Sequence, residues 1–322
     1  MFRKIFLLSV ISCSIFFLQI NSTYANFKYA TPNPTTEFSC MDYPPIYPTY
    51  SWETLPNTEF YQIQIFHENK LIRELKNTEA FNKVTDLNPY IEPGKYFWQV
   101  RVVDNKNNPL SDWSAKNYFT VEKSVTFAVL GDSISHGGAN FIPAGQLGCQ
   151  WETFCDVPVK NLARSGDTTA AMLERFERDV LPFSPQVLII FGGTNDIRLG
   201  LSAEEVINHL SALRDKCFAN NITPVLVTIP PMNEKIIRSR GIFITDKDWR
   251  TERTKLNSWI IQNGGIEISR ELVDFAEELR EDLTPDGLHP NTRGKLFIGK
   301  TIENFLRENF SELITKKSWE IE

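Results

Sequence analysis

Three apolar runs in the C-terminal two thirds of the chain constrain its fold more than any other feature. They cover residues 125–130, 187–191 and 224–229, and each is followed directly by glycine or by two prolines. Continuous apolar strands of this kind are typical of a parallel sheet that is covered on both faces. Segments between the runs carry apolar residues at helical spacing, such as Val206, Leu210, Leu213 and Cys217. This alternation predicts a three-layer α/β/α domain over residues 123–322.

Residues 26–122 follow a different pattern, in which apolar and polar residues alternate. The alternation covers residues 61–65 and 96–102, and clusters of Asn, Asp, Pro and Gly separate such runs. A period of two is typical of strands with one buried face, and several short strands at this spacing indicate a small all-β sandwich domain. Residues 96–104, followed by Ser-Asp-Trp-Ser at 111–114, also resemble part of a fibronectin type III module.

Residues 1–25 have the composition of a secretory signal peptide. Arg3 and Lys4 precede an apolar run over residues 5–20, and Ala25 offers a small residue for cleavage. An uncleaved membrane anchor is one alternative, but the run is shorter than the ~20 residues that a spanning helix needs. A lipoprotein modified at Cys13 is another, although the apolar run continues beyond this cysteine. We therefore predict a secreted or periplasmic protein with no stable membrane span after cleavage.

Charge and cysteine usage narrow the class of partner. The formal charge is −6, and cleavage after Ala25 would take it to −8 because two basic residues are removed. An acidic chain is a poor partner for nucleic acid. The cysteines that remain are Cys40, Cys149, Cys155 and Cys217, and none has the spacing of a zinc site. In an exported protein a disulfide between Cys149 and Cys155 is one expectation, and free thiols are the alternative.

Four short blocks, each at the end of an expected strand, carry residues suited to nucleophilic catalysis. Gly131-Asp132-Ser133 follows the first strand, and a serine on a tight turn can present its hydroxyl as a nucleophile. Asp286 lies three residues before His289, so its carboxylate can hold Nδ1 of that ring and leave Nε2 free to accept a proton. Between these blocks lie Gly166, in Arg-Ser-Gly-Asp, and Asn195, in Gly-Thr-Asn-Asp. The four blocks in this order predict a serine hydrolase.

These blocks resemble those of the SGNH hydrolases, also called the GDSL esterase/lipase superfamily. The resemblance covers about residues 124–310, and the four residues of the name match Ser133, Gly166, Asn195 and His289. It implies that Ser133, Asp286 and His289 are catalytic. It also implies an oxyanion hole made of the backbone N–H groups of Ser133 and Gly166 and the side-chain amide of Asn195. The competing α/β-hydrolase family is disfavoured, because Ser133 lacks the second glycine of a Gly-x-Ser-x-Gly turn.

Other residues near these blocks have more ordinary interpretations. We expect His136 to line the rim of the pocket, His67 to lie on the surface and His209 to be structural. No acid is placed to orient His136 as Asp286 orients His289. Trp151 and Phe154, on the segment after the nucleophile, either border the substrate or pack that segment onto the domain.

The resulting prediction is an exported serine esterase that forms an acyl-enzyme on Ser133 and needs no metal or organic cofactor. Its substrate would be a small-molecule or glycan ester, with an O-acetyl or other short acyl group on a carbohydrate as the leading idea. A lipid esterase of the lysophospholipase or arylesterase kind is the enzymatic alternative. A glycan-binding surface protein with a vestigial hydrolase domain is the alternative from another class.

Overall fold

A computed structural model of the chain describes residues 27–36, 38, 41–58, 60–77, 82–139 and 147–314. The predicted signal peptide over residues 1–25 therefore lies outside the described residues, as do Cys13 and Cys40. Within the described part, no helix is both long enough and apolar enough to cross a membrane.

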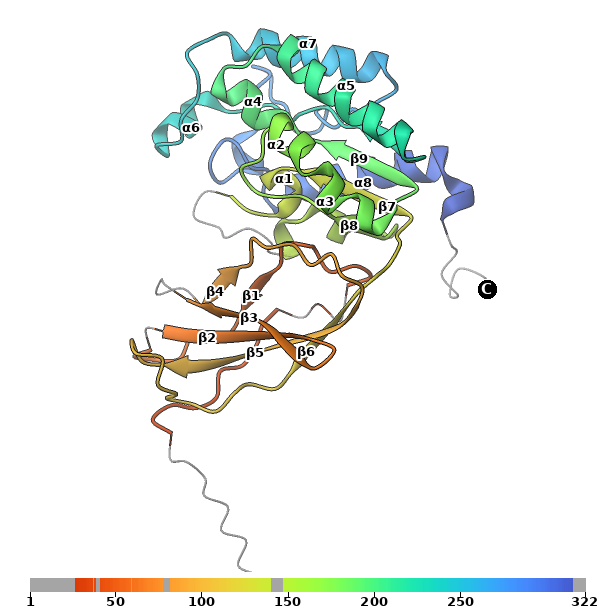
Figure 1. The fold of residues 1–322 in the computed structure, drawn as a ribbon. Helices are drawn as coiled ribbons and strands as arrows, with labels where there is room; N and C mark the ends of the chain where they lie inside the picture. Colours follow the sequence, from red (N-terminus) through yellow and green to blue (C-terminus); the bar gives the residue numbers. More distant parts are fainter. Residues whose placement is uncertain are drawn as a thin grey trace, which may run out of the picture.

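The N-terminal β region, by which we mean the described residues between 27 and 121, contains two antiparallel sheets (Figure 1). The smaller sheet pairs β1 (Thr49–Ser51) with β4 (Lys83–Thr85). The larger sheet has the order β3-β2-β5-β6, with β2 at Phe60–His67, β3 at Lys70–Lys76, β5 at Gly94–Val103 and β6 at Asn117–Val121.

The expected alternation places aromatic side chains between these sheets. Tyr50 of β1 packs against Trp98 of β5 with ring centroids 5.0 Å apart, and Trp52 packs against Tyr61 of β2 at 4.9 Å. All four side chains are buried. Large aromatic side chains bury much apolar surface, so these pairs hold the small sheet against the large one.

A four-stranded parallel sheet follows, with the order β10-β9-β7-β8. The predicted runs become β7 (Phe127–Gly131), β9 (Val187–Phe191) and β10 (Thr223–Leu226), which confirms the predicted parallel α/β sheet. The fourth strand, β8 (Val159–Asn161), precedes the Gly166 block, where a strand was expected, but none of the three apolar runs covers it. Its central residue is Lys160, which is buried with its Nζ 3.5 Å from the carboxylate of Glu122, so the strand has no apolar run to reveal it.

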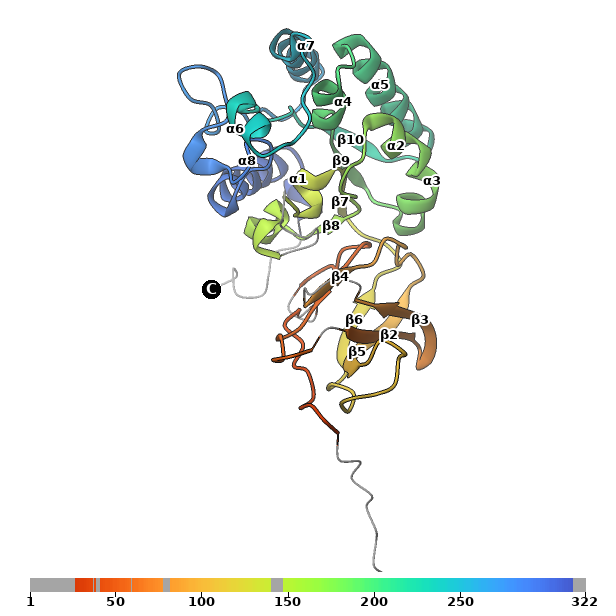
Figure 2. The ribbon, with the colours of Figure 1, turned by 90° about the vertical axis from the view of Figure 1, so that its left-hand side faces the viewer.

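Helices cover both faces of this sheet (Figure 2). One face is packed by α2 (Thr169–Glu174), α3 (Phe176–Asp179), α5 (Ala203–Ala219) and α7 (Trp249–Gln262). The other face is packed by α8 (Thr292–Asn309), which buries Ile298, Ile302 and Leu306. The remaining helices are α1 (Ser133–His136), α4 (Thr194–Leu199) and α6 (Glu234–Ser239). Short 3₁₀ turns cover Leu147–Cys149, Trp151–Phe154, Leu181–Phe183, Glu281–Leu283 and Ser311–Leu313.

The expected disulfide between Cys149 and Cys155 is wrong, because both thiols are free. The 3₁₀ turn Trp151–Phe154 separates the two cysteines, and it packs against α8. Cys155 therefore faces that helix, where its Sγ donates a hydrogen bond to the Gly299 carbonyl at 3.1 Å. Burial raises the pKa of this thiol well above its usual range. The third described cysteine, Cys217, is a buried thiol on α5, as predicted.

Candidate active site

The serine of the first block opens α1 directly after strand β7. Asp132 caps this helix, because its Oδ1 accepts a hydrogen bond of 2.8 Å from the backbone N–H of Ile134. At Gly131 a Cβ atom would lie only 2.7 Å from the carbonyl oxygen of Phe191, so only glycine fits where β7 and β9 approach each other. The turn leaves Ser133 partly exposed at the carboxyl end of the sheet, where ligands bind in open α/β folds.

Ser133, His289 and Asp286 form a hydrogen-bonded chain. The Ser133 Oγ lies 2.8 Å from Nε2 of His289, and Nδ1 of the same ring lies 2.8 Å from Oδ2 of Asp286. A carboxylate accepts the hydrogen bond from Nδ1, so the proton of a neutral ring lies on Nδ1 and Nε2 accepts from the serine hydroxyl. The structure thus brings together the three predicted residues, although Ser133 and His289 lie 156 positions apart in the sequence.

The segment from Thr284 to His289 is held by its own hydrogen bonds. Asp286 Oδ1 accepts from the backbone N–H groups of Leu288 and His289, at 3.0 and 2.8 Å. The Thr284 hydroxyl donates to the His289 carbonyl at 2.8 Å. Gly287 has a φ of +81°, and a Cβ there would lie 2.6 Å from the Asn233 carbonyl oxygen. These contacts fix the direction of the imidazole ring before any substrate arrives.

The other two predicted residues lie on the same cavity, which has a volume of about 310 Å³. Gly166 has a φ of +88°, and its backbone lies on an exposed turn. Asn195 lies in the first turn of α4, where its Nδ2 donates to the Asp167 carbonyl at 2.9 Å. Its Oδ1 accepts from Arg198 at 3.3 Å. The bond to Asp167 uses one of the two Nδ2 protons, which leaves the other for a ligand. The cavity is lined by Ser133, Gly138, Ala139, Ser165, Gly166, Asn195, Arg198, Ile242, Leu288 and His289.

Comparison with known families agrees with this geometry. The sequence profile of the GDSL-like Lipase/Acylhydrolase family matches residues 129–295. The chain belongs to this family. It is accordingly a carboxylic ester hydrolase, and members of this class act on small-molecule esters.

Several solved structures resemble this acylhydrolase at low sequence identity. A lipase/acylhydrolase from Enterococcus faecalis is 22% identical with a TM-score of 0.47, covering 60% of this chain and 99% of that one. A GDSL-like lipase from Bacteroides thetaiotaomicron is 19% identical with a TM-score of 0.46, covering 58% and 88%. The esterase EstA from Pseudoalteromonas is 21% identical with a TM-score of 0.41, covering 58% and 98%. No curated protein matches the chain.

Arg198 is the main residue of the acylhydrolase cavity that sequence reasoning missed. Its guanidinium donates to Asn195 Oδ1 and, at 2.6 Å, to the Phe243 carbonyl. Burial lowers the pKa of this guanidinium, and the Asp132 carboxylate partly offsets that effect. Its spacing of three residues from Asn195 on α4 is the only sequence signal, since residues at this spacing share a helix face.

His136, which was expected at the pocket rim, lies elsewhere, as do Trp151 and Phe154, for which a place beside the substrate was one of two alternatives. His136 does not line the pocket rim but is fully buried beneath it. Trp151 is also buried, and its Nε1 donates to Ser135 Oγ at 2.9 Å, so it packs its segment onto the domain. Phe154 lines a separate cavity of about 460 Å³ together with Met41 and Tyr43.

His209 contacts Thr169 at 3.0 Å and lies outside the cavity that contains Ser133. Among the described residues, no cluster of three or more His, Cys, Asp or Glu is arranged to hold a metal ion.

A buried group of charges lies behind the turn that carries Ser133 in the acylhydrolase. Lys295 of α8 is fully buried and donates from Nζ to the Ile134 carbonyl of α1. Burial lowers the pKa of Lys295 to about 8 and raises the pKa values of Asp132 and Glu152 each to about 7. The positive charge of Lys295 opposes the rise at both carboxyls, so it supports their ionised forms.

We expect Lys295→Met to destabilise the protein more at pH 8 than at pH 5. At pH 5 both carboxyls are protonated in the folded state, so losing the cation costs little. Near pH 8 they are ionised, and removing one member of a buried charge group typically costs about 3–5 kcal/mol. The sign follows because carboxyls with raised pKa values bind more protons in the folded state, so stability falls as the pH rises from their unfolded pKa values to about 7. Without Lys295 both folded pKa values rise further, so the fall continues to higher pH.

Urea denaturation of wild type and variant at the two pH values measures this effect. Lys300→Met on the same helix is the matched control, since Lys300 is about half exposed and pairs with Glu303 at 2.8 Å. Glu303 is buried but keeps its ion pair with Arg307 at 2.9 Å, so we expect the loss of the half-exposed Lys300 to cost at most about 1 kcal/mol at either pH. An equal loss of stability for Lys295→Met at both pH values would contradict the coupling to Asp132 and Glu152.

Proposed function

We propose that the protein hydrolyses short acyl esters through an acyl-enzyme on Ser133. The observation that carries the proposal is the continuous hydrogen-bonded chain from Ser133 through His289 to Asp286, with both heavy-atom distances at 2.8 Å. The Ser133 oxygen attacks the ester carbonyl while His289 Nε2 takes its proton, and Asp286 stabilises the imidazolium that forms. His289 then protonates the leaving alcohol. Water, activated by the same ring, attacks the acyl-enzyme and releases the acid.

The oxyanion formed in both steps would be held by three N–H donors. These are the backbone groups of Ser133 and Gly166 and the side-chain amide of Asn195. Such donors stabilise charge that exists only in the transition state, so they raise the rate more than they tighten substrate binding. The fixed amide of Asn195, bonded on both sides, supports this role because it need not reorganise during the reaction.

The cavity favours a short acyl group on a polar alcohol. Its volume of about 310 Å³ is at the lower end of the range of about 300–1,000 Å³ that is typical of small-molecule sites. Ser165, Asn195 and Arg198 contribute polar groups beside the apolar Ile242 and Leu288. An O-acetyl group on a carbohydrate has this combination of a small acyl chain and a hydroxyl-rich leaving group.

We also propose that residues 26–122 form a β-sandwich domain of the fibronectin type III kind, and that the protein is exported after cleavage of residues 1–25. The two antiparallel sheets joined by aromatic pairs support the first point. Arg3 and Lys4 before the apolar run over residues 5–20, with the small residue Ala25 after it, support the second.

A panel of p-nitrophenyl esters and acetylated glycans tests the proposed substrate class. We expect kcat/KM to fall by at least about tenfold from acetyl to octanoyl, because a small pocket discriminates against added methylenes. We further expect release of acetate from acetylated oligosaccharides. A kcat/KM that rises with chain length, together with turnover of lysophospholipid, would point to the lipid esterase instead. Absence of turnover on every ester would leave the glycan-binding alternative.

A further inference from the structure

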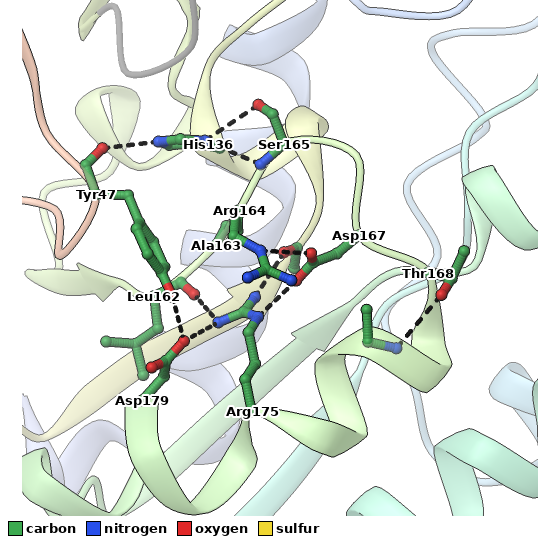
Figure 3. A network of polar contacts seen from close by, with 12 residues as sticks. Tyr47, His136, Leu162, Ala163, Arg164, Ser165, Asp167, Thr168, Arg175 and Asp179 are labelled. Atoms are coloured by element: carbon green, nitrogen blue, oxygen red, sulfur yellow. Dashed lines mark hydrogen bonds and ion pairs between the residues drawn. The ribbon is translucent and has the colours of Figure 1, made fainter. Parts of the chain in front are cut away.

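His136 links the N-terminal β region to the loop that carries Gly166 (Figure 3). Its Nε2 lies 2.8 Å from the backbone carbonyl oxygen of Tyr47. Its Nδ1 lies 2.9 Å from the backbone nitrogen of Ser165 and 3.1 Å from the Ser165 hydroxyl. A carbonyl only accepts, so Nε2 carries the proton and Nδ1 accepts from the Ser165 N–H. The two ring nitrogens therefore bind different residues: Nε2 binds Tyr47 of the N-terminal β region, and Nδ1 binds Ser165 of the loop that carries Gly166.

Burial keeps this ring in the neutral form that the contacts require. His136 is fully buried, and burial lowers its pKa to about 4. A protonated ring would present a donor to the Ser165 N–H, which also donates. The ring therefore remains an acceptor toward the loop at any pH at which an esterase with a histidine base is active.

A second path joins Tyr47 to the same loop (Figure 3). The Tyr47 hydroxyl donates to Asp179 Oδ2 at 2.5 Å, and Arg175 binds that carboxylate at 2.9 Å. The same guanidinium donates to Asp167 Oδ2 at 2.5 Å and to the Gly131 carbonyl at 3.1 Å. All of these side chains are buried. Arg175 thus connects the N-terminal β region, the loop and the turn that precedes Ser133.

The loop depends on such contacts for its position. Residues 162–168 lie between β8 and α2, outside any helix or strand, and Ser165 and Gly166 are exposed on the cavity. The Asp167 carbonyl in turn accepts from Asn195 Nδ2. Two of the proposed oxyanion donors, the Gly166 N–H and the Asn195 amide, are therefore tied to this one loop.

We propose that His136 is a positioning residue, which transmits the placement of Tyr47 in the N-terminal β region to the oxyanion donors on the Gly166 loop. This inference rests on the proposed esterase mechanism and extends it to a residue outside the cavity. It makes the N-terminal β region a structural part of the active site and not only an appended module. The physical reason is that oxyanion donors act over short distances, and a displacement of 1 Å can cost about 100-fold in rate.

Two variants separate the two contacts of the ring. His136→Asn keeps an acceptor near the position of Nδ1 for the Ser165 N–H, but is too short to reach the Tyr47 carbonyl. His136→Gln keeps a donor at the reach of Nε2, but offers no acceptor where Nδ1 lies. His67→Asn is the control for loss of a histidine in the N-terminal β region, where His67 stacks on Tyr96 with ring centroids 4.2 Å apart.

The measurement is the steady-state hydrolysis of p-nitrophenyl acetate by the full chain, with active sites counted by a serine-directed phosphonate. Counting sites removes the effect of any misfolded fraction. We expect both His136 variants to lower kcat per site by about 10- to 100-fold with KM changed less than about threefold, because misplaced oxyanion donors act on the transition state. His67→Asn should leave both constants unchanged.

A normal kcat in either His136 variant would overturn the inference, because it would show that one of the two contacts is dispensable. A rise in KM with kcat unchanged would overturn it too, since that result indicates altered ground-state binding. Wild-type turnover that is lost in Ser133→Ala establishes the esterase mechanism without reference to His136. The proposed function can therefore hold while the inference fails. No turnover by the wild type would overturn both.

Discussion

We expect Ser133→Ala to abolish ester hydrolysis while the protein remains folded. The Ser133 hydroxyl is the only covalent nucleophile in the proposed mechanism, and removing such a group costs up to about 10⁶-fold in kcat. Ser133 is partly exposed, and its Oγ bonds to His289, so the change removes little buried surface. Thermal denaturation of wild type and variant should therefore give similar midpoints while turnover of p-nitrophenyl acetate disappears.

Covalent labelling identifies the nucleophile independently of turnover. A serine-directed phosphonate should add once to the wild type and not to Ser133→Ala. Ser165→Ala is the matched control, since Ser165 is the other serine that lines the cavity, and this variant should still be labelled once. Labelling of the Ser133→Ala variant at Ser165, with activity retained, would show that Ser165 and not Ser133 is the nucleophile.

The second large effect concerns Asn195. We expect Asn195→Ala to lower kcat by about 10²–10³ with a smaller change in KM, because the lost donor acts mainly on the developing oxyanion. The alanine variant also removes most of the side chain, so a second substitution of the same shape is needed to show that the amide N–H groups, and not the side-chain volume, are required.

Asn195→Asp provides that comparison. The carboxylate has the shape of the amide and can pair with Arg198. It has no N–H to offer to the oxyanion or to the Asp167 carbonyl, and its negative charge faces the oxyanion. It should therefore be at least as slow as Asn195→Ala, and steady-state kinetics of the two variants on p-nitrophenyl acetate measure this. A kcat near the wild-type value in Asn195→Asp would exclude the amide as an oxyanion donor.

His289 and His136 both lie near Ser133, but their different partners and burial suit them to different roles. His289 has a carboxylate at Nδ1 and the serine hydroxyl at Nε2, so its ring can take up a proton and share the charge with Asp286. His136 has a carbonyl at Nε2 and an N–H at Nδ1, and it is sealed from the cavity. The first environment suits a base and the second suits a fixed connection.

Features that depend on neighbours in the chain were determined by the sequence. The capping box of α5 is one example, with Ser202 accepting from the Glu205 N–H and Glu205 bonding back to the Ser202 N–H. The cap of α8 by Asn291 and the contact between Asp286 and His289 are others. In each case the partners lie within about one helical turn, so spacing alone brings them together. The apolar strands were predictable because burial on both faces leaves a continuous run.

Only the tertiary structure decided the features that depend on distant partners. Strand β8 has no apolar run that could give its bounds, because Lys160 at its centre is buried opposite Glu122 from another part of the chain. Cys149 and Cys155 are close in sequence, yet packing against α8 turns Cys155 to Gly299. The sequence indicates nothing unusual about His136, three residues after Ser133, and only packing shows that it connects Tyr47 to Ser165. A residue's local sequence sets its backbone and its chemistry, but which group meets it is set by long-range packing of the whole chain.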